Sequence, residues 1–264
     1  AMLGKEPQDW DITTSALPMQ VKELFRRTVD TGIQHGTVTV LLDRVGFEVT
    51  TYRVDGKYED GRHPTEVSFT ASLAEDLKRR DFTINAMAYN ETEGLVDLFR
   101  GAEDLEQGII RCVGVAKERF SEDALRILRA FRFSAQLDFY IEEETLSAAK
   151  ELAGTLQKIS AERIYAELTK LLVSGHPGRL LTAYECGVTK VILPEFDTMC
   201  ETPQNHPAHY AAVGRHALDT VCLVKRMSEY GEEGGFSREE FRYLRLAALL
   251  HDVGKPVCHS TDEK

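Results

Sequence analysis

The chain has 264 residues, of which 42% are hydrophobic and 28% charged, with a formal net charge of -11 and a sequence pI near 5.3. This length suits about two domains, and the composition is that of an ordinary globular protein. No apolar run approaches the roughly 18 residues of a membrane span and nothing resembles a signal peptide, so no membrane partner is expected. The acidic balance argues against broad attraction to nucleic acid, although a local basic groove can coexist with it. The five scattered cysteines form no C-x-x-C pair and suit reduced thiols in the cytoplasm.

The first part of the chain predicts a mixed α and β head. Residues 37–42 and 47–52 are rich in β-branched and aromatic residues, and the residues between them can turn, so a hairpin is predicted. Ser72 and Glu75 form the capping-box pattern of a helix start. The other expectations are a helix at 19–26 after Pro18, a polar loop at 53–68, a helical region that opens at Ser72 and ends at Gly94, and short strands at 95–99 and 109–113.

From residue 114 onward the hydrophobic pattern becomes helical, without a strand signal of comparable strength. Helices are predicted at residues 143–153, 160–174, 178–186, 212–230 and 238–251. The predicted fold class is therefore α+β, with a mixed head followed by an all-α remainder. The expected domains are the head at 1–113, a neck and body at 114–200, and a further helical region at 201–264.

Two carboxylates, Asp9 and Asp11, stand two residues apart near the start of the chain. In an extended segment they share one face, while Trp10 and Ile12 point to the other face, toward a core. Adjacent carboxylates repel each other and favour a bound cation, and Mg²⁺ prefers such oxygen ligands. The alternative is a solvated turn, where the D-x-D pattern is common.

Glu48 is the best candidate for a third carboxylate, because a lone acid at the start of a Thr-rich, otherwise apolar strand is unusual. With Asp9 and Asp11 it would form a site for two Mg²⁺ ions. Such a site promotes in-line phosphoryl transfer by positioning and charge neutralisation. Alternatively, Glu48 lies on a solvated strand face.

The segment 79–85 gathers two arginines, a carboxylate and an amide. Arginine suits phosphate, Asp81 can accept hydrogen bonds from ribose hydroxyls, and Asn85 can bridge polar groups beside Arg80. The alternative is a solvated helix end with local ion pairs.

Asp123 and Arg126 are three residues apart and would share one face of a helix. An arginine donor beside an aspartate acceptor complements the Watson–Crick edges of cytosine and adenine, and it mismatches uracil and guanine. The pair therefore predicts selection of C and A without a nucleic-acid template. Alternatively, Ser121 caps a helix with acids in its first turn, and Asp123 pairs with Arg126. Arg129 and Arg132 continue the row and would face a polyanion or solvent.

A third group of candidate ligands lies near the end of the chain. His251 and Asp252 close an apolar helix, and with His216 they could hold a metal for phosphate-ester hydrolysis. His206 and His209 are additional, weaker candidates. The alternative is an ordinary helix C-terminus.

Taken in order, these motifs resemble the class II tRNA nucleotidyltransferases, which are the CCA-adding enzymes and their bacterial poly(A) polymerase relatives. The resemblance implies a polymerase-β-like head, a helical neck and body, and Mg²⁺ as the metal. It implies CTP and ATP as substrates and addition of CCA to the 3′ end of tRNA, with release of pyrophosphate. The matching stretches are LGKEPQDWDI, HGTVTVLLD, FEVTTYR, RRDFTINAMAYN, LVDLFRGAEDLEQGIIRCVG, ERFSEDALRILRAFRF and SAERIYAEL.

By position, the resemblance assigns roles to the candidate residues. Asp9 and Asp11 are the implied metal carboxylates, and Glu48 is the additional acid. The implied nucleotide contacts are Arg80, Asp81 and Asn85 for ribose and phosphate, Asp123 and Arg126 as the amino-acid template for C and A, and Arg129 and Arg132 in the adjoining part of the pocket. Glu162 and Arg163 would support the neck helices, and His216, His251 and Asp252 fall in a stretch that resembles the HD region of many bacterial members.

Several alternatives stay open. Poly(A) polymerase is the nearest competitor, and an A-adding or CC-adding relative fits as well. Two further alternatives are a phosphohydrolase with an RNA-binding head, and a catalytically silent tRNA-binding module. The family's Gly-Gly segment ending in V-R-D has no counterpart before Ala1, and the HD stretch ends before any later aspartate ligand. We therefore expect a protein with this sequence alone to be inactive, and no oligomeric state is indicated.

Overall fold

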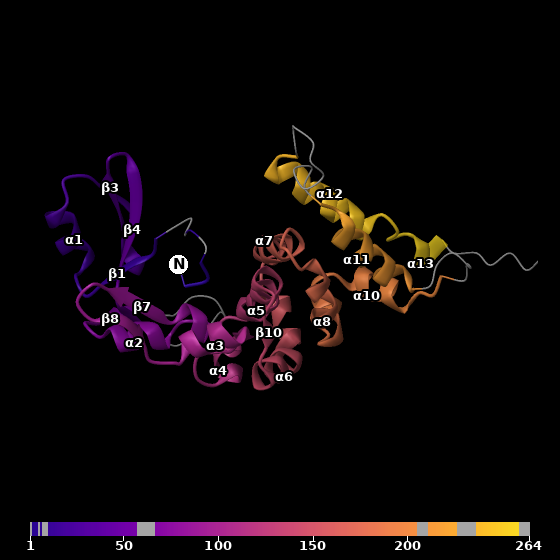
Figure 1. Cartoon of the computed structure of the whole chain (residues 1–264), viewed down its shortest axis with the longest axis horizontal. Helices are drawn as coiled ribbons and strands as arrows, with labels where there is room; N and C mark the ends of the chain where they lie inside the picture. Colours follow the sequence, from indigo (N-terminus) through magenta and orange to yellow (C-terminus); the bar gives the residue numbers. More distant parts are fainter. Residues whose placement is uncertain are drawn as a thin grey trace, which may run out of the picture. The chain divides into compact units, whose positions relative to one another are not determined.

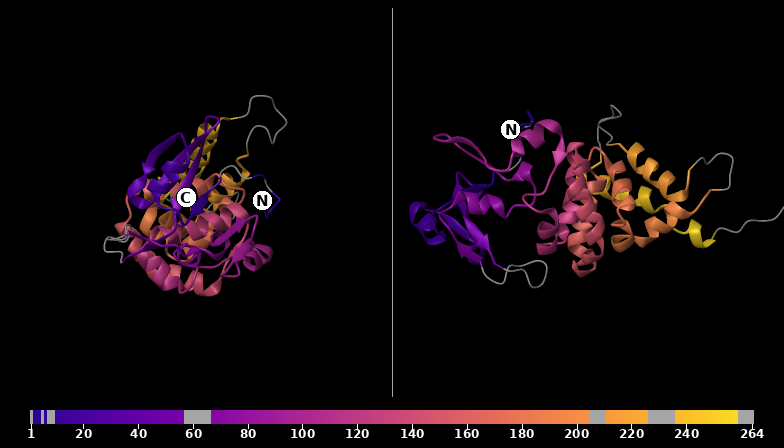
Figure 2. Two further views of the ribbon diagram at one scale, coloured as in Figure 1. Left: turned by 90° about the vertical axis from the view of Figure 1, so that its left-hand side faces the viewer. Right: turned by 90° about the horizontal axis from the view of Figure 1, so that it is seen from below.

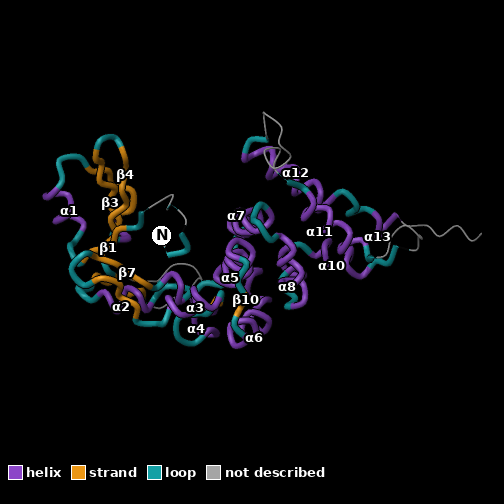
Figure 3. Tube along the Cα trace, viewed as in Figure 1, coloured by secondary structure: helices purple, strands orange, loops and turns teal. Residues whose placement is uncertain are grey.

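The computed structural model describes residues 2–4, 6, 10–56, 67–204, 211–225 and 236–258 (Figure 1). The chain divides into two compact units, Ala1–Gly101 and Ala102–Lys264. Strands gather mainly in the first unit and helices dominate the second (Figure 3). The predicted α+β class, with a mixed head followed by a helical part, is confirmed. None of the described helices has the length and apolar character that a membrane span requires. The predicted domain boundaries after residues 113 and 200 remain predictions.

The first unit is built on a four-stranded sheet of order β1-β4-β3-β2. The predicted hairpin is confirmed, with Leu42 opposite Val45 and a turn of two residues between them. Asp43 and Arg44 both have positive φ, at 47° and 70°, which is the geometry of a type I′ turn. The strands are β1 (Ile12–Thr14), β2 (Thr28–Gly32), β3 (Thr37–Leu42) and β4 (Val45–Thr51), and a 3₁₀ turn η1 (Ile33–His35) joins β2 to β3.

One face of this sheet is covered by helix α1 (Pro18–Leu24), which the sequence predicted after Pro18. Val21 of α1 forms a core cluster with three strand valines, Val38, Val40 and Val49. Trp10 and Ile12 are 61% and 42% exposed, so the prediction that they point into a core is wrong. The reason is that α1 packs against the central strands β3 and β4, whereas β1 is a three-residue edge strand.

The rest of the first unit departs in places from the prediction. Residues 53–68 do not form a simple loop, because β5 (Arg53–Asp55) pairs with β6 (Val67–Phe69). Helix α2 (Leu73–Lys78) begins as predicted, with the Ser72 hydroxyl accepting from the Glu75 N–H at 3.4 Å. It ends at Lys78, however, far short of the predicted end at Gly94, and a 3₁₀ turn η2 (Thr83–Asn85) follows. An unpredicted strand β7 (Met87–Asn90) forms a hairpin with β8 (Gly94–Asp97).

The helices of the second unit pack in succession along the chain (Figure 2), and several predicted helices are confirmed within one or two residues. The helix predicted at 212–230 ends at Leu223, and residues 226–230 lie outside the described part. The short strand predicted at 109–113 is present as the two residues of β9, and its parallel pairing with β10 was not predicted. The elements are α3 (Gly101–Gln107), β9 (Ile109–Ile110), α4 (Ala116–Glu122), α5 (Leu125–Leu137), β10 (Tyr140–Ile141), α6 (Glu143–Leu152), η3 (Ala153–Lys158), α7 (Ala161–Leu172), η4 (Pro177–Arg179), α8 (Leu180–Glu185), α9 (Thr189–Ile192), α10 (Pro194–Glu201), α11 (Val213–Leu223), α12 (Arg238–Leu250) and α13 (Lys255–Cys258).

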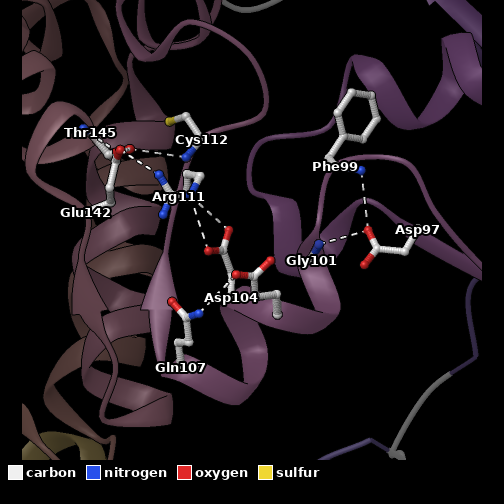
Figure 4. A network of polar contacts seen from close by, with 10 residues as sticks. Asp97, Phe99, Gly101, Asp104, Gln107, Arg111, Cys112, Glu142 and Thr145 are labelled. Atoms are coloured by element: carbon white, nitrogen blue, oxygen red, sulfur yellow. Dashed lines mark hydrogen bonds and ion pairs between the residues drawn. The ribbon is translucent and has the colours of Figure 1, made fainter.

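A polar network fastens α3 to β9 and α6 in the second unit (Figure 4). Arg111 contacts both oxygens of the buried Asp104 carboxylate at 3.1 and 3.2 Å and one oxygen of Glu142 at 2.8 Å. The other Glu142 oxygen accepts from the backbone and hydroxyl of Thr145, whose hydroxyl in turn accepts from the Cys112 N–H. These charge-assisted bonds hold the start of the second unit in a fixed arrangement.

Candidate functional site

Asp11, which directly precedes β1, lies beside Glu48 of the neighbouring strand β4 in the head sheet. The parallel register pairs Ile12 with Val49, so the preceding residues, Asp11 and Glu48, are also adjacent. Alternation along the strands puts both on the face opposite Val49 and α1. Both residues are exposed, and among the described residues neither carboxylate has an ion-pair partner. Two uncompensated carboxylates in this arrangement provide the oxygen ligands that a hard divalent cation prefers. Asp9 lies outside the described residues.

Threonine hydroxyls make this face of the sheet polar and ordered. The Thr13 hydroxyl donates to the Thr50 carbonyl at 3.2 Å, and the Thr37 and Thr50 hydroxyls lie 3.0 Å apart. Thr39, which is opposite Glu48 on β3, has its hydroxyl 2.9 Å from that of Thr31. Hydrogen bonds between neighbouring strands therefore surround the two acids on this face of the sheet. They limit how far Asp11 and Glu48 move relative to each other.

The arginines of the segment 79–85 converge on Asp76, a buried residue to which the sequence pattern assigns no role. Arg79 donates to one Asp76 oxygen through Nε and Nη2 at 3.0 and 2.8 Å, and Arg80 Nη2 lies 3.6 Å from the other oxygen. The same carboxylate accepts from the Arg53 N–H at 3.3 Å, which joins β5 to α2. An acid in the first turn of a helix looks like an ordinary dipole effect in sequence, so only its burial reveals this role.

Asp81 and Asn85 are held to each other by local hydrogen bonds. The buried Asp81 accepts from its neighbour's backbone, the Phe82 N–H, at 2.9 Å and from the Asn85 amide at 3.1 Å. Arg80 donates to the Asn85 carbonyl at 3.4 Å. The structure thus brings the three predicted ribose and phosphate contacts together, and their contact with a nucleotide stays a prediction.

Asp123 occupies a break between two helices instead of a helical position. Helix α4 ends at Glu122, α5 begins at Leu125, and Asp123 is extended with φ -142° and ψ 105°. Ser121 therefore lies inside α4 and caps nothing, and the expectation that Asp123 and Arg126 share one helix face is wrong. At the break, the Asp123 carboxylate accepts a hydrogen bond from the N–H of Leu125, two residues further along the chain, at 3.0 Å.

The two template candidates are each paired with a different charge. Among the described residues, Asp123 pairs with Arg163 of α7, whose Nη2 donates at 2.9 Å. Arg126 donates to Glu122 at 2.6 Å and to the Arg119 carbonyl at 3.2 Å. The expected alternative of a direct Asp123–Arg126 pair is therefore absent from the described contacts, and Arg163 takes the supporting position that the resemblance implied.

Arg132 is 8% exposed and binds Glu167, which is 5% exposed, through a 2.5 Å contact between α5 and α7. Its Nη1 donates to Gln136 at 2.7 Å, and its guanidinium lies 3.8 Å from the centre of the Phe133 ring. Arg129 lies over the same ring at 5.3 Å. These contacts explain Arg132 as a link between helices. The alternative that Arg132 faces solvent is wrong, because the side chain is buried. The predicted nucleotide contacts of Arg129 and Arg132 stay predictions.

The predicted HD residues gather at one point in the described part of the second unit. Ligand atoms of His216, His251 and Asp252 all lie within 4.8 Å of one another, and the two imidazole rings are 5.4 Å apart. Asp252 contacts His251 Nε2 at 3.2 Å and the ammonium of Lys255 at 2.7 Å. Lys255 was not singled out in the sequence, and it competes with any cation for Asp252. The weaker candidates, His206 and His209, lie outside the described residues.

Comparison with known proteins gives the family. Residues 1–111 match the family model described as Poly A polymerase head domain, and residues 138–200 match the one described as probable RNA and SrmB-binding site of polymerase A. The chain belongs to the family of poly(A) polymerases and CCA-adding enzymes. The predicted resemblance is thereby confirmed.

Relatives and solved structures agree with this assignment. The chain is 55% identical over 181 residues to the CCA-adding enzyme of Lactiplantibacillus plantarum, a match that covers 69% of this chain and 44% of that protein. It is 55% identical over 173 residues to the enzyme of Enterococcus faecalis, covering 66% and 43%. The crystal structure of the Bacillus stearothermophilus CCA-adding enzyme in complex with CTP matches with a TM-score of 0.67 at 41% identity, covering 75% of this chain and 49% of that one. The chain thus spans about half the length of the curated relatives it matches.

Proposed function

We propose that this chain provides the head and the nucleotide-selecting part of a tRNA nucleotidyltransferase, which adds CCA to the 3′ end of tRNA from CTP and ATP. The observation that carries the proposal is the register that puts Asp11 beside Glu48 on the polar face of the sheet. The CCA-adding relatives and the match to an enzyme solved with CTP support it. All five cysteines are free, which fits a protein of the cytoplasm.

Family membership implies a divalent metal ion, and we propose that it is Mg²⁺. Asp11 and Glu48 fit such an ion because they offer exposed carboxylate oxygens without a competing cation among the described residues. Asp9 would complete the set from the adjacent segment. The bound metal would neutralise triphosphate charge and assist attack by the primer hydroxyl on the α-phosphate, with pyrophosphate leaving. The ordered threonine face keeps the two acids at a fixed separation.

Asp123 and Arg126 act in this proposal as the acceptor and donor that read the base. The Asp123 carboxylate accepts one hydrogen bond on each oxygen, from Leu125 and from Arg163. Because a carboxylate has about four acceptor positions, it can still accept a bond from the exocyclic amino group of C or A. A carbonyl at the same place, as in U or G, would meet a second acceptor and be rejected.

The activity test uses the protein that carries this chain and tRNA transcripts that end before CCA. Each nucleoside triphosphate is supplied alone, and then CTP is supplied with ATP. We expect two C additions with CTP alone, a complete CCA end with both, and no addition from UTP or GTP. Long tails from ATP alone would identify a poly(A) polymerase and contradict the proposal, as would restriction to A only or CC only.

A pair of variants tests the site itself. Asp11→Asn removes one metal carboxylate and should reduce transfer at least about 100-fold, because charge neutralisation supplies most of the catalysis. Glu23→Gln alters an exposed carboxylate of the same unit, on α1, and should leave transfer unchanged. Equal activity of the two variants would exclude Asp11 from the site.

The cluster of His216, His251 and Asp252 supports a second candidate function, a metal-dependent phosphohydrolase. Two imidazoles and a carboxylate suit a transition-metal ion. Asp252→Asn should then abolish hydrolysis of a chromogenic phosphodiester and leave nucleotide transfer intact. Asp219→Asn, on the surface of α11, is the matched control. Absence of metal-stimulated hydrolysis in the unmodified protein would remove this candidate.

A further inference from the structure

A basic hollow of about 770 Å³ opens at the end of the head sheet that carries the β3–β4 turn. Three of its lining residues follow α1, namely Phe25, Arg26 and Arg27. The remaining ones, Leu41, Leu42, Asp43 and Arg44, come from the end of β3 and the β3–β4 turn. The hollow thus combines three arginines with one aspartate, in a chain whose net charge is -11. We call it the arginine hollow.

The three guanidinium groups of the arginine hollow are not used by the fold. Arg26, Arg27 and Arg44 are exposed, and none of them has an ion-pair or hydrogen-bond partner for its side chain among the described residues. Elsewhere the arginines of the described part commonly pair with acids, as Arg79 does with Asp76 and Arg132 with Glu167. Three uncompensated cations around one concavity attract an anion with several charges.

The backbone that carries these arginines is well ordered. The Leu41 N–H donates to the Arg27 carbonyl at 3.0 Å, which ties the segment after α1 to β3. Arg44 is the second central residue of the two-residue type I′ turn, with φ 70°, and this turn is fixed by the flanking strand pairing. The backbone positions from which the three guanidinium groups extend are therefore fixed, so no backbone has to be ordered when an anion binds.

Apolar surface lies among the charges. Phe25 is 37% exposed and Leu42 is 48% exposed, and both line the arginine hollow. An exposed aromatic ring beside arginines is the combination on which single-stranded nucleic acid binds, with phosphates on the guanidinium groups and a base against the ring. A free inorganic anion would make no use of the apolar part.

We propose that the arginine hollow binds the phosphate backbone of an RNA strand. The choice of RNA over another polyanion rests on the proposed function. Arg44 precedes Glu48 by four residues, so their Cα atoms are about 13 Å apart along the line of β4. At about 3.4 Å of rise per stacked nucleotide, this separation corresponds to about four nucleotides. The carboxylates lie on the face opposite α1, whereas Leu42 and the residues that follow α1 line the hollow, so an RNA strand that reaches both must pass the end of the sheet at the β3–β4 turn. Four nucleotides is therefore the smallest number that connects a primer end at the carboxylates to the arginine hollow.

The experiment measures binding of a fluorescent tRNA transcript that ends before CCA, without nucleotide or metal, across a range of salt concentrations. The variant Arg26→Gln/Arg44→Gln removes two charges from the arginine hollow. The matched control Lys22→Gln/Lys78→Gln removes two charges from exposed or half-exposed lysines of the same unit, outside the hollow. Each lost phosphate contact should lower the slope of log K against log salt by about 0.7 to 0.9, so the hollow variant should lose about 1.4 to 1.8. We expect at least about tenfold weaker binding at low salt, and no comparable change in the control.

Equal slopes for the hollow variant and the unmodified protein would overturn the proposal, and so would an equal loss in the lysine control. A loss of CTP affinity with unchanged RNA binding would also overturn it, because the ligand would then be a free triphosphate. Thermal unfolding of both variants checks that the fold is intact, and because the substituted side chains are exposed we expect little change. Binding is read without turnover, so failure of CCA addition and failure of this proposal give different results.

Discussion

Replacing Arg132 by methionine should destabilise the second unit strongly, because the change leaves a buried carboxylate without its main partner. Arg132 and Glu167 are both buried and meet through a 2.5 Å contact between α5 and α7. The only other cation that the described contacts give Glu167 is Lys170, 3.4 Å away with a half-exposed side chain. The substitution also removes the bond from Arg132 to Gln136.

The expected cost is about 3 to 5 kcal/mol, the range found when one partner of a buried ion pair is removed. For a domain of about 150 to 250 residues, each kcal/mol lowers Tm by about 2 to 4 °C, so Tm should fall by about 6 to 20 °C. The double variant Arg132→Met/Glu167→Met removes both charges and should recover most of this loss, since an apolar pair of similar volume replaces the ion pair. Recovery separates loss of the charge partner from general damage to packing.

The assay is urea unfolding followed by circular dichroism, with Arg215→Met as the matched control. Arg215 pairs with Asp219 on the surface of α11, where the two side chains are 53% and 33% exposed, so its loss should cost less than about 1 kcal/mol. A cost below about 1 kcal/mol for Arg132→Met would refute the reasoning. A double variant as unstable as the single one would show that the lost stability comes from packing and not from the unpaired carboxylate.

Three further outcomes follow from the packing of the second unit. Gly214→Ala should lower the free energy of unfolding by about 1 to 3 kcal/mol, because a Cβ there would lie 2.5 Å from the Cys200 sulfur and 2.6 Å from its backbone nitrogen. A Cβ at Gly175 meets nothing within 4 Å, so Gly175→Ala should be tolerated. Urea unfolding of the two variants compares these costs. Burial raises the pKa of the Cys200 thiol to about 11 from 9.0. At neutral pH the thiol should therefore be alkylated about 100-fold more slowly in the folded protein than in the unfolded chain. Mass spectrometry measures the two rates, and equal rates would contradict this expectation. Arg245→Met should lower Tm by several degrees in a melting experiment, because this buried side chain donates to backbone carbonyls at the ends of α7 and α11; an unchanged Tm would argue against that role.

The parts of the fold that the sequence predicted are those set by neighbouring residues. The hairpin at 37–51 follows from alternating β-branched residues around a short polar turn, and the helices at 143–152 and 161–172 follow from their apolar period. Trp10 was assigned to a core incorrectly because alternation identifies two faces but does not say which strands a helix covers. That choice depends on how α1 packs, which is a tertiary property.

The candidate site was predicted unevenly for a similar reason. Glu48 could be named as a partner for Asp11 in advance, because a lone acid at the start of a Thr-rich, otherwise apolar strand is unusual. The register that puts the two residues side by side comes from the structure. The partners of the arginines could not be named in this way, since Arg132 finds Glu167 at a separation of 35 residues, and Asp76 shows its importance only through burial. From the sequence, a row of arginines spaced three apart, such as Arg126, Arg129 and Arg132, is expected to face solvent. Only the position of α7 in the structure shows that Arg132 is buried.

The break at Asp123 has the same origin and bears most directly on base selection. In a continuous helix Asp123 and Arg126 would face each other and pair, and each would neutralise the group that must read a base. In the observed arrangement Glu122 binds Arg126 and Arg119, at 2.6 and 2.9 Å, while the extended Asp123 reaches Arg163 on α7. Asp123 and Arg126, the two side chains proposed to read the base, are therefore each positioned by an ion pair with another residue and not by a pair with each other. It follows that α7, which sequence spacing alone does not connect to residue 123, orients the Asp123 carboxylate through Arg163. The discrimination between an amino group and a carbonyl that we propose for Asp123 would depend on this orientation.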